Sequence, residues 1–202
     1  MTDQSVMSSD RSVSMISWVS TEAPPATEHR TRAALLDAGV LIAERHGLGG
    51  LSVNRVVAQA GVAKGTFYVH FADRADFIDA LHARFHAVVQ DAVAKATDGV
   101  PIGAKRIARG AIAYLDVCLA NRAVKALALE ARADPSLTES MSARHERAAS
   151  AAVPSFKAMG WPSPTVAAQL GAAMTAEIAM RELEAGRRLP SARRALLRYL
   201  EA

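Results

Sequence analysis

The sequence predicts an all-α fold, in which a small N-terminal domain of three helices is joined to a larger helical C-terminal domain. Apolar residues recur at three- and four-residue spacing along most of the chain after residue 26, which is the period of an amphipathic helix. No segment alternates apolar and polar residues for long enough to predict a strand. Gly and Pro fall between the periodic segments, where they end helices and turn the chain. We expect the first domain to span residues 27–73 and the second to span residues 74–202.

Residues 1–26 differ from the rest of the chain. They are rich in Ser and Thr, reach Pro24 and Pro25, and sustain no period. They also lack the basic start and long apolar run of a secretory signal. We expect a flexible N-terminal tail.

The first helix is expected from Thr27 or Glu28 to about Arg45 or His46. Its apolar positions form two adjacent rows, which together make one wide stripe: Leu35, Gly39, Ile42, Leu36, Val40 and Ala43. Residues 47–50, Gly-Leu-Gly-Gly, then end the helix and turn the chain.

The second helix is short and has signals at both ends. Ser52 can cap its first turn by accepting a backbone N–H, and Val53, Val56 and Val57 follow at helical spacing. Gly61 can stop it, because glycine adopts a positive φ at little cost.

A third helix of about two turns begins at Ala63 or Lys64. Phe67 and Phe71 lie four residues apart and share one face, which we assign to the core. The remaining positions are Lys, Gly, Thr, Tyr, Val and His, which suit a phosphate backbone and base edges better than a core. Three short helices around one cluster predict a helix-turn-helix unit.

At these residues the chain resembles the TetR/AcrR family of bacterial transcriptional regulators. The matching features are the Gly61-Val62 turn, the run Lys64-Gly65-Thr66-Phe67-Tyr68, and His70-Phe71 followed by Asp73-Arg74. The resemblance covers about residues 28–90 well. It departs at Arg74, where the family usually carries Lys, and either cation can meet a phosphate. The DNA-contacting positions that the resemblance implies are Ser52, Asn54, Lys64, Gly65, Thr66, Tyr68, His70 and Arg74.

The C-terminal domain is expected to be a set of longer helices. Asp73 can cap a helix that runs to about Lys95, with Phe77, Ile78, Leu81 and Phe85 on its buried face. Further helices are expected at about 103–120, 122–133, from a cap at Ser136 to Gly160 with a break or kink at Pro154, 163–185, and 190–199. Gly186 should end the fifth of these six helices.

An effector pocket is expected among helices in about residues 103–181, where polar or soft side chains interrupt apolar faces. The candidates are Tyr114, Cys118, Glu130, Met141, His145, Met174 and Glu177. Each has a structural alternative, since Met and Cys often fill core gaps and Glu177 can pair with Arg181 four residues on. The alanine-rich helices favour a small-molecule effector that is largely apolar.

The last two helices also predict a subunit interface. Their apolar stripes could instead fill the core of a monomer, but the family resemblance favours a two-fold four-helix bundle between subunits. The residues assigned to the dimer interface are Val166, Leu170, Met174, Ile178, Leu196, Leu197 and Leu200.

The resemblance implies a ligand-responsive transcriptional regulator, most simply a repressor, that binds an inverted-repeat operator in double-stranded DNA as a homodimer. A net charge of +4 favours nucleic acid only mildly. Cys118 is the only cysteine, so a single chain has no internal disulfide and no cysteine-based zinc set. We expect no cofactor, no metal, no membrane span and a cytoplasmic location.

Two rival classes remain open. An all-helical enzyme would need a catalytic set, and the sequence contains no nucleophile elbow, phosphate-binding Gly loop or metal-ligand spacing; His82 and His86 lie four apart without an accompanying carboxylate pattern. An architectural or protein-interaction protein without an effector would bind DNA with little dependence on its sequence.

Overall fold

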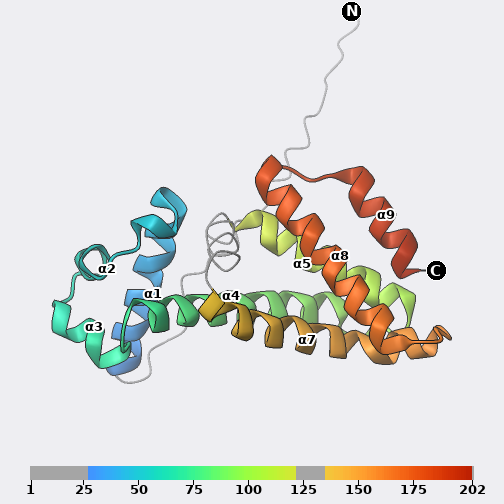
Figure 1. The fold of residues 1–202 in the computed structure, drawn as a ribbon, viewed down its shortest axis with the longest axis horizontal. Coiled ribbons are helices and arrows are strands. Elements are labelled where there is room, and N and C mark those ends of the chain that lie inside the picture. The colour runs from blue at the N-terminus through green and yellow to red at the C-terminus, as the bar shows by residue number, and fades with distance from the viewer. Residues whose placement is uncertain (1–26, 122–134, 202) are drawn as a thin grey trace, which may run out of the picture.

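The computed structural model describes residues 27–121 and 135–201, and every regular element in these two ranges is a helix. Figure 1 shows a small domain at one end and a bundle of longer helices at the other. The predicted all-α, two-domain architecture is confirmed. The expected tail at 1–26 and the expected helix at about 122–133 lie outside the described residues.

The N-terminal domain consists of α1 (Thr27–His46), α2 (Val53–Ala60) and α3 (Lys64–His70), with a 3₁₀ turn η1 (Leu48–Gly50) between the first two helices. Each helix begins within a residue of its predicted start. Both predicted rows of α1 are buried, and they pack on the valines of α2.

Three aromatic rings form the centre of this domain. Phe67 and Phe71 come from α3 and its C-cap, and Phe77 comes from the following helix, with ring centroids 5.0–5.4 Å apart. All three side chains are fully buried. Gly39 of α1 packs directly against these rings. A Cβ at that position would stand 2.6 Å from Cζ of Phe77, so a larger residue would not fit without a shift.

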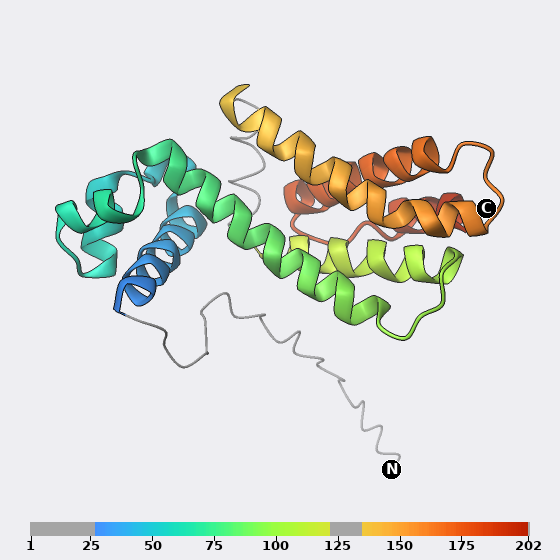
Figure 2. The ribbon, with the colours of Figure 1, turned by 90° about the horizontal axis from the view of Figure 1, so that it is seen from below.

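Helix α4 (Arg74–Thr97) connects the two domains. Its 24 residues span about 36 Å at the usual helical rise. Phe77, Ile78 and Leu81 pack in the N-terminal core, whereas Phe85 and Val89 pack in the C-terminal core. In Figure 2 this helix runs diagonally from the small domain into the bundle. One rigid element therefore belongs to both cores.

The bundle is completed by α5 (Ala104–Ala120), α7 (Pro135–Ala158), α8 (Pro164–Ala185) and α9 (Pro190–Leu200). Gly186 adopts a φ of 65° and ends α8 as predicted. Two expectations need correction, the start of α7 and the break within it. Helix α7 begins at Pro135, one residue before the expected cap at Ser136, and Pro154 lies inside it without ending it. The kink that was the alternative to a break stays a prediction. Pro at a first helical position costs no hydrogen bond, because its missing N–H would have no partner there.

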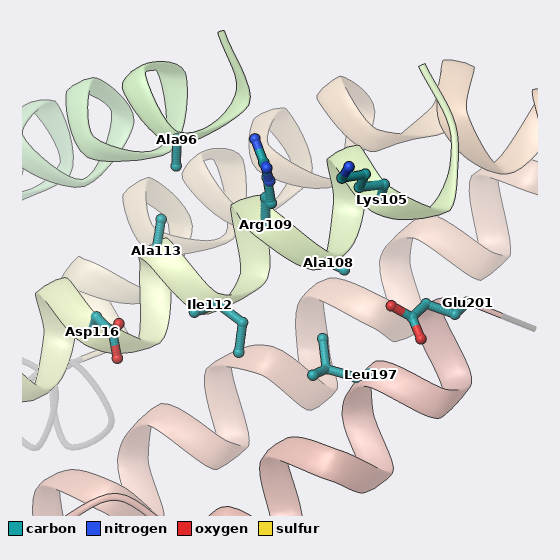
Figure 3. Close-up of a pocket in the computed structure, with 9 residues that line it drawn as sticks. All are labelled: Ala96, Lys105, Ala108, Arg109, Ile112, Ala113, Asp116, Leu197 and Glu201. Atoms are coloured by element: carbon teal, nitrogen blue, oxygen red, sulfur yellow. The ribbon is translucent and has the colours of Figure 1, made fainter. Parts of the chain in front are cut away.

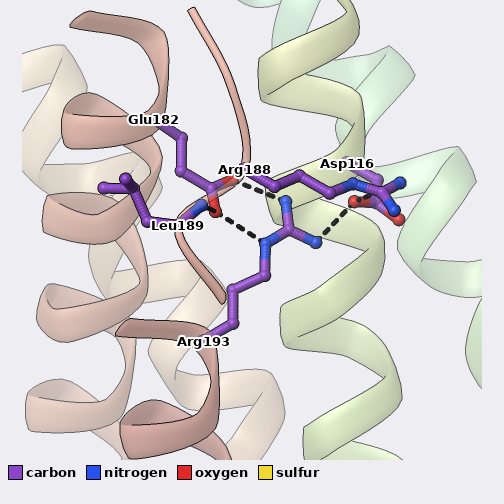
Figure 4. Close-up of polar contacts among 5 residues, drawn as sticks. All are labelled: Asp116, Glu182, Arg188, Leu189 and Arg193. Carbon is purple, nitrogen blue, oxygen red and sulfur yellow. Dashed lines mark hydrogen bonds and ion pairs between the residues drawn. The ribbon is translucent and has the colours of Figure 1, made fainter. Parts of the chain in front are cut away.

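A charged network ties α5, α8 and α9 together (Figure 4). Glu182 of α8 is fully buried and accepts hydrogen bonds from Nε of Arg193 at 2.7 Å and from the backbone N–H of Leu189 at 2.7 Å. Arg193 of α9 also donates to Asp116 of α5 at 2.6 Å, and Arg188 lies 3.1 Å from the same carboxylate oxygen. Burial acts to raise the pKa of Glu182, but the bonds from Arg193 and Leu189 outweigh it and hold the pKa below its ordinary value. The buried charge is therefore fully compensated.

Within the two described ranges, no helix combines the length and the apolar character needed to cross a lipid bilayer.

Candidate nucleic-acid interface and effector cavity

The turn between α2 and α3 fixes how α3 is presented. Ser52 caps α2, with its Oγ accepting the backbone N–H of Arg55 at 3.3 Å. Gly61 has a φ of 68° in the left-handed region, and the N–H of Val62 then donates to the carbonyl of Val57 at 3.1 Å. Both features agree with the sequence prediction. They set α3 across α2 with its Phe67 side turned inward.

The outward side of α3 is polar and open. Tyr68 is 52% exposed and Val69 71% exposed, Lys64 and Gly65 are exposed, and Thr66 and His70 are half-buried. Nothing lies within 4 Å of the position that a Gly65 Cβ would occupy, so the backbone of α3 can approach another molecule closely. Ser52 and Asn54 are exposed at the start of α2. Five of the eight predicted DNA contacts thus lie on α3, and two lie at the start of α2.

Arg74, the eighth, differs from the other seven. Its Nε donates to the carbonyl of Leu51 at 2.7 Å, and one Nη donates to the carbonyl of Leu48 at 3.0 Å. The guanidinium therefore holds the start of α4 against the turn before α2. A direct phosphate contact by this residue stays a prediction.

The profile of the family described as bacterial regulatory proteins, tetR family, matches residues 35–81. This range contains the buried half of α1, all of α2 and α3, and the first turns of α4. Residues 35–81 therefore carry the N-terminal domain of TetR-family regulators. The α2–α3 unit is accordingly a DNA-binding helix-turn-helix.

Solved structures extend the likeness to the whole fold. A TetR-like transcriptional regulator from Rhodococcus sp. RHA1 has a TM-score of 0.69 at 16% identity, over 89% of this chain and 96% of that chain. A transcriptional regulator of the TerR/AcrR family from Aquifex aeolicus VF5 has a TM-score of 0.62 at 16% identity, over 84% and 97%. A ketosteroid transcriptional regulator of Mycobacterium tuberculosis has a TM-score of 0.55 at 17% identity, over 90% and 94%. No protein among those with curated functions matches significantly. At these identities the likeness shows the TetR-like fold alone.

A partly open cavity of about 230 Å³ lies within the helical bundle. Side chains from α4, α5, α7, α8 and α9 line it, and most of them are alanine or other apolar residues. Its polar groups are Thr97, Arg106, Tyr114, Ser155 and Thr175. Most of the lining comes from the helices of residues 103–181, where the effector pocket is predicted, and the rest comes from α4 and α9. An effector bound in this cavity stays a prediction.

Only part of the predicted pocket set lines this cavity. Tyr114 does, and it is hydrogen-bonded to Cys118, one turn along α5. Burial raises the pKa of Cys118 to about 12, although the bond from Tyr114 acts to lower it, so the thiol stays protonated and poorly nucleophilic. Burial likewise holds the pKa of Tyr114 well above its ordinary value.

The other candidates fall elsewhere. Met174 and Glu177 line no cavity described here; Met174 packs at the edge of the bundle core, and Glu177 is exposed and pairs with Arg181 at 2.9 Å. Glu130, and the side chains of Met141 and His145, lie outside the described residues. The sequence reasoning missed Arg106 and Ser155. A usable signal was the pair Lys105-Arg106 in the first turn of a helix, where cations oppose the helix dipole and need other partners.

An open groove of about 580 Å³ runs between α5 and α9 (Figure 3). Lys105, Arg109, Asp116 and Glu201 contribute both signs of charge to it, beside apolar residues such as Ile112 and Leu197. Mixed charge on an open surface suits water, so the less open and more apolar bundle cavity is the better candidate for a ligand.

The predicted dimer surface divides into two sets. On α8, Val166 and Leu170 are each 52% exposed, with Met174 and Ile178 half-buried along the same stripe. On α9, Leu196 and Leu200 are 2% and 1% exposed and belong to the core of the bundle, and Leu197 borders the groove. Leu196 and Leu200 therefore offer almost no surface to a partner in this subunit, and their assignment to an interface stays a prediction. They pack beneath α9 in the subunit's own core, so a partner could reach them only after α9 had moved.

Proposed function

We propose that this protein is an effector-responsive repressor that binds an inverted-repeat operator as a homodimer in the bacterial cytoplasm. The observation that carries the proposal is that α3 has one buried face and one exposed face. Phe67 and Phe71 are buried in the domain core, which leaves Lys64, Tyr68 and Val69 exposed on the outer side. An α-helix with such a side fits the major groove, where cations and hydroxyls meet phosphates and an apolar group can touch a thymine methyl.

A homodimer is supported by the open apolar stripe of α8 and by the length of the reading helix. Helix α3 has seven residues and can contact only a few base pairs, so two copies held about 34 Å apart would multiply affinity and specificity. An effector in the bundle cavity would favour a state in which that spacing no longer fits DNA. The affinity for the operator would then fall by the effector's differential preference for that state.

The DNA proposal is tested by selecting bound fragments from random duplex DNA with the full chain and reading their consensus. We expect a palindrome. Lys64→Ala should weaken binding to it and reduce the salt dependence by about one phosphate contact, and Tyr68→Phe should weaken it by about tenfold or less. Lys95→Ala, which removes an exposed lysine of α4 paired with Asp91, is the matched control and should change neither property.

Sequence-independent binding, or equal losses in Lys64→Ala and Lys95→Ala, would contradict the proposed reading face. Loss of the dimer in Tyr68→Phe would show that α3 has been assigned the wrong outer side.

The dimer is tested separately by sedimentation of Leu170→Ser. Leu170 is half-exposed in the subunit, so the folded subunit should lose little stability while association weakens. Ile102→Ser, at an apolar residue that is 60% exposed outside α8, is the control and should stay dimeric. A Leu170→Ser protein that sediments like wild type would place the interface elsewhere.

A further inference from the structure

We propose that the bundle cavity binds a compact, largely apolar molecule that carries a carboxylate, with Arg106 and Ser155 holding the acid group. The inference rests on the proposed effector function and adds the chemical class of the effector. It starts from the charge of the cavity wall. Among the described residues that line the cavity, Arg106 alone is ionised at neutral pH, so this part of the wall carries a positive charge and no negative one.

The guanidinium of Arg106 is only partly used by the protein. Its Nη1 donates to the carbonyls of Thr97 at 2.9 Å and Val100 at 2.8 Å, which fixes the group at the end of α4. Among the described residues, its Nε and Nη2 have no hydrogen-bond partner. These two nitrogens form the edge of a guanidinium that matches both oxygens of a carboxylate.

Ser155 adds a buried donor from a different helix. Its side chain is 3% exposed, and its Oγ accepts the backbone N–H of Gly103 at 3.2 Å. Within the part of the chain that the structure describes, its own O–H has no acceptor. Gly103 is the N-cap of α5 and stands three residues before Arg106, so the Ser155 hydroxyl of α7 lies beside the first turn of α5. A buried hydroxyl proton without an acceptor is costly, and a ligand oxygen would remove that cost.

The start of α5 strengthens the preference for an anion. Its first turn has no acidic residue and carries Lys105 beside Arg106. The positive end of the helix dipole is therefore not neutralised by its own side chains. An amine or a quaternary cation would meet only unfavourable charge here.

The rest of the cavity wall determines the polarity and size of the ligand beyond its acid group. Phe156, Ile107 and Leu200, together with alanines of α7 and α8, make it mostly apolar. The volume of about 230 Å³ is below the roughly 300–1,000 Å³ of sites for drug-sized molecules, which favours a compact ligand. Tyr114 follows Arg106 by eight positions on α5, or about 12 Å at the usual rise, and its phenol donates to Cys118.

The test is calorimetric titration of the full chain with three matched probes: octanoate, octanamide and octylamine. We expect octanoate to bind at least about tenfold more tightly than the amide, because a hydrogen bond to a charged group is the stronger kind, and we expect no binding of the amine. Arg106→Gln should remove that preference by weakening octanoate about tenfold or more while the amide changes less than about twofold. Arg109→Gln, one turn along α5 and outside this cavity, is the matched control and should behave as wild type.

Arg106 also holds the end of α4, so Arg106→Gln could unfold the bundle. Circular dichroism would detect this, and two milder variants then decide. Ser155→Ala should weaken octanoate by about three- to tenfold, and Ala172→Leu, which fills the cavity, should abolish binding of all probes.

Three results would overturn the inference. The first is equal affinity of the wild type for octanoate and octanamide. The second is an equal loss of affinity for both probes in Arg106→Gln or, if that variant unfolds, in Ser155→Ala, and the third is no binding of octanoate at about 1 mM. Affinity for the selected DNA is measured on the same samples. A chain that binds the palindrome but ignores the acid loses only this inference, whereas a chain that binds no DNA loses the proposed function.

Discussion

The N-terminal domain fills its core with three aromatic rings, whereas the C-terminal bundle is lined with alanine and leaves a cavity. In the first, Phe67, Phe71 and Phe77 lie with centroids 5.0–5.4 Å apart, and the neighbouring helix carries Gly39 because no Cβ would fit. In the second, about 230 Å³ stays open between five helices. A tightly packed core holds α3 in one orientation, and spare volume in the bundle is what a ligand can use. Helix α4 contributes to both cores, so a change in the packing of the bundle can be transmitted to the N-terminal domain through this helix.

The largest effect is expected from Phe67→Ala. Removing this fully buried ring should cost about 3–5 kcal/mol of unfolding free energy, since the two remaining rings cannot collapse into the space. Hydrogen exchange should then accelerate in residues 27–81 while the bundle helices stay protected. The control is Tyr68→Ala in the next position, which is half-exposed and should cost less than about 1 kcal/mol. Similar exchange in both variants would mean that the aromatic cluster does not hold the domain together.

The second-largest effect is expected from Glu182→Gln in the bundle, which should change how the unfolding free energy depends on pH. Glu182→Gln leaves Arg193 with Asp116 alone, and breaking a buried pair in this way should cost about 3 kcal/mol at pH 7. Because the folded pKa of Glu182 is lowered, its contribution is present above the unfolded value near 4.5 and is lost as the pH falls through the folded value. Urea unfolding of the wild type should therefore weaken below about pH 4.5 more than that of the variant does.

An equal dependence on pH in wild type and Glu182→Gln would show that the network contributes nothing through this carboxylate. Glu184→Gln, at an exposed glutamate two positions along α8, is the control and should unfold like wild type.

The same comparison explains which features the sequence could predict. The ends of α2 and α3 and the start of α4 were predictable because their signals are local: a cap at Ser52, a positive φ at Gly61 and a cap at Asp73, all of which the structure contains. The cavity wall was not predictable, because Arg106 and Ser155 are 49 positions apart and meet only through the packing of α5 on α7. Periodicity finds an apolar face but not its partner, so Leu196 and Leu200 could not be separated from the exposed stripe of α8.

The smallest effect compares two mid-helix glycines, one in each region. Gly39→Ala would place a Cβ 2.6 Å from Phe77 in the aromatic cluster, near the upper end of the roughly 1–3 kcal/mol that overpacking costs. Gly110→Ala in the cavity wall would place its Cβ at an ordinary 3.5 Å from Val93. Both changes gain up to about 1 kcal/mol in helix propensity, so Gly39→Ala should lower the unfolding free energy and Gly110→Ala should raise it slightly. If the unfolding free energies of both variants changed in the same direction, the cavity wall would be packed as tightly as the aromatic cluster. The proposed difference in packing between the bundle and the N-terminal domain would then be wrong.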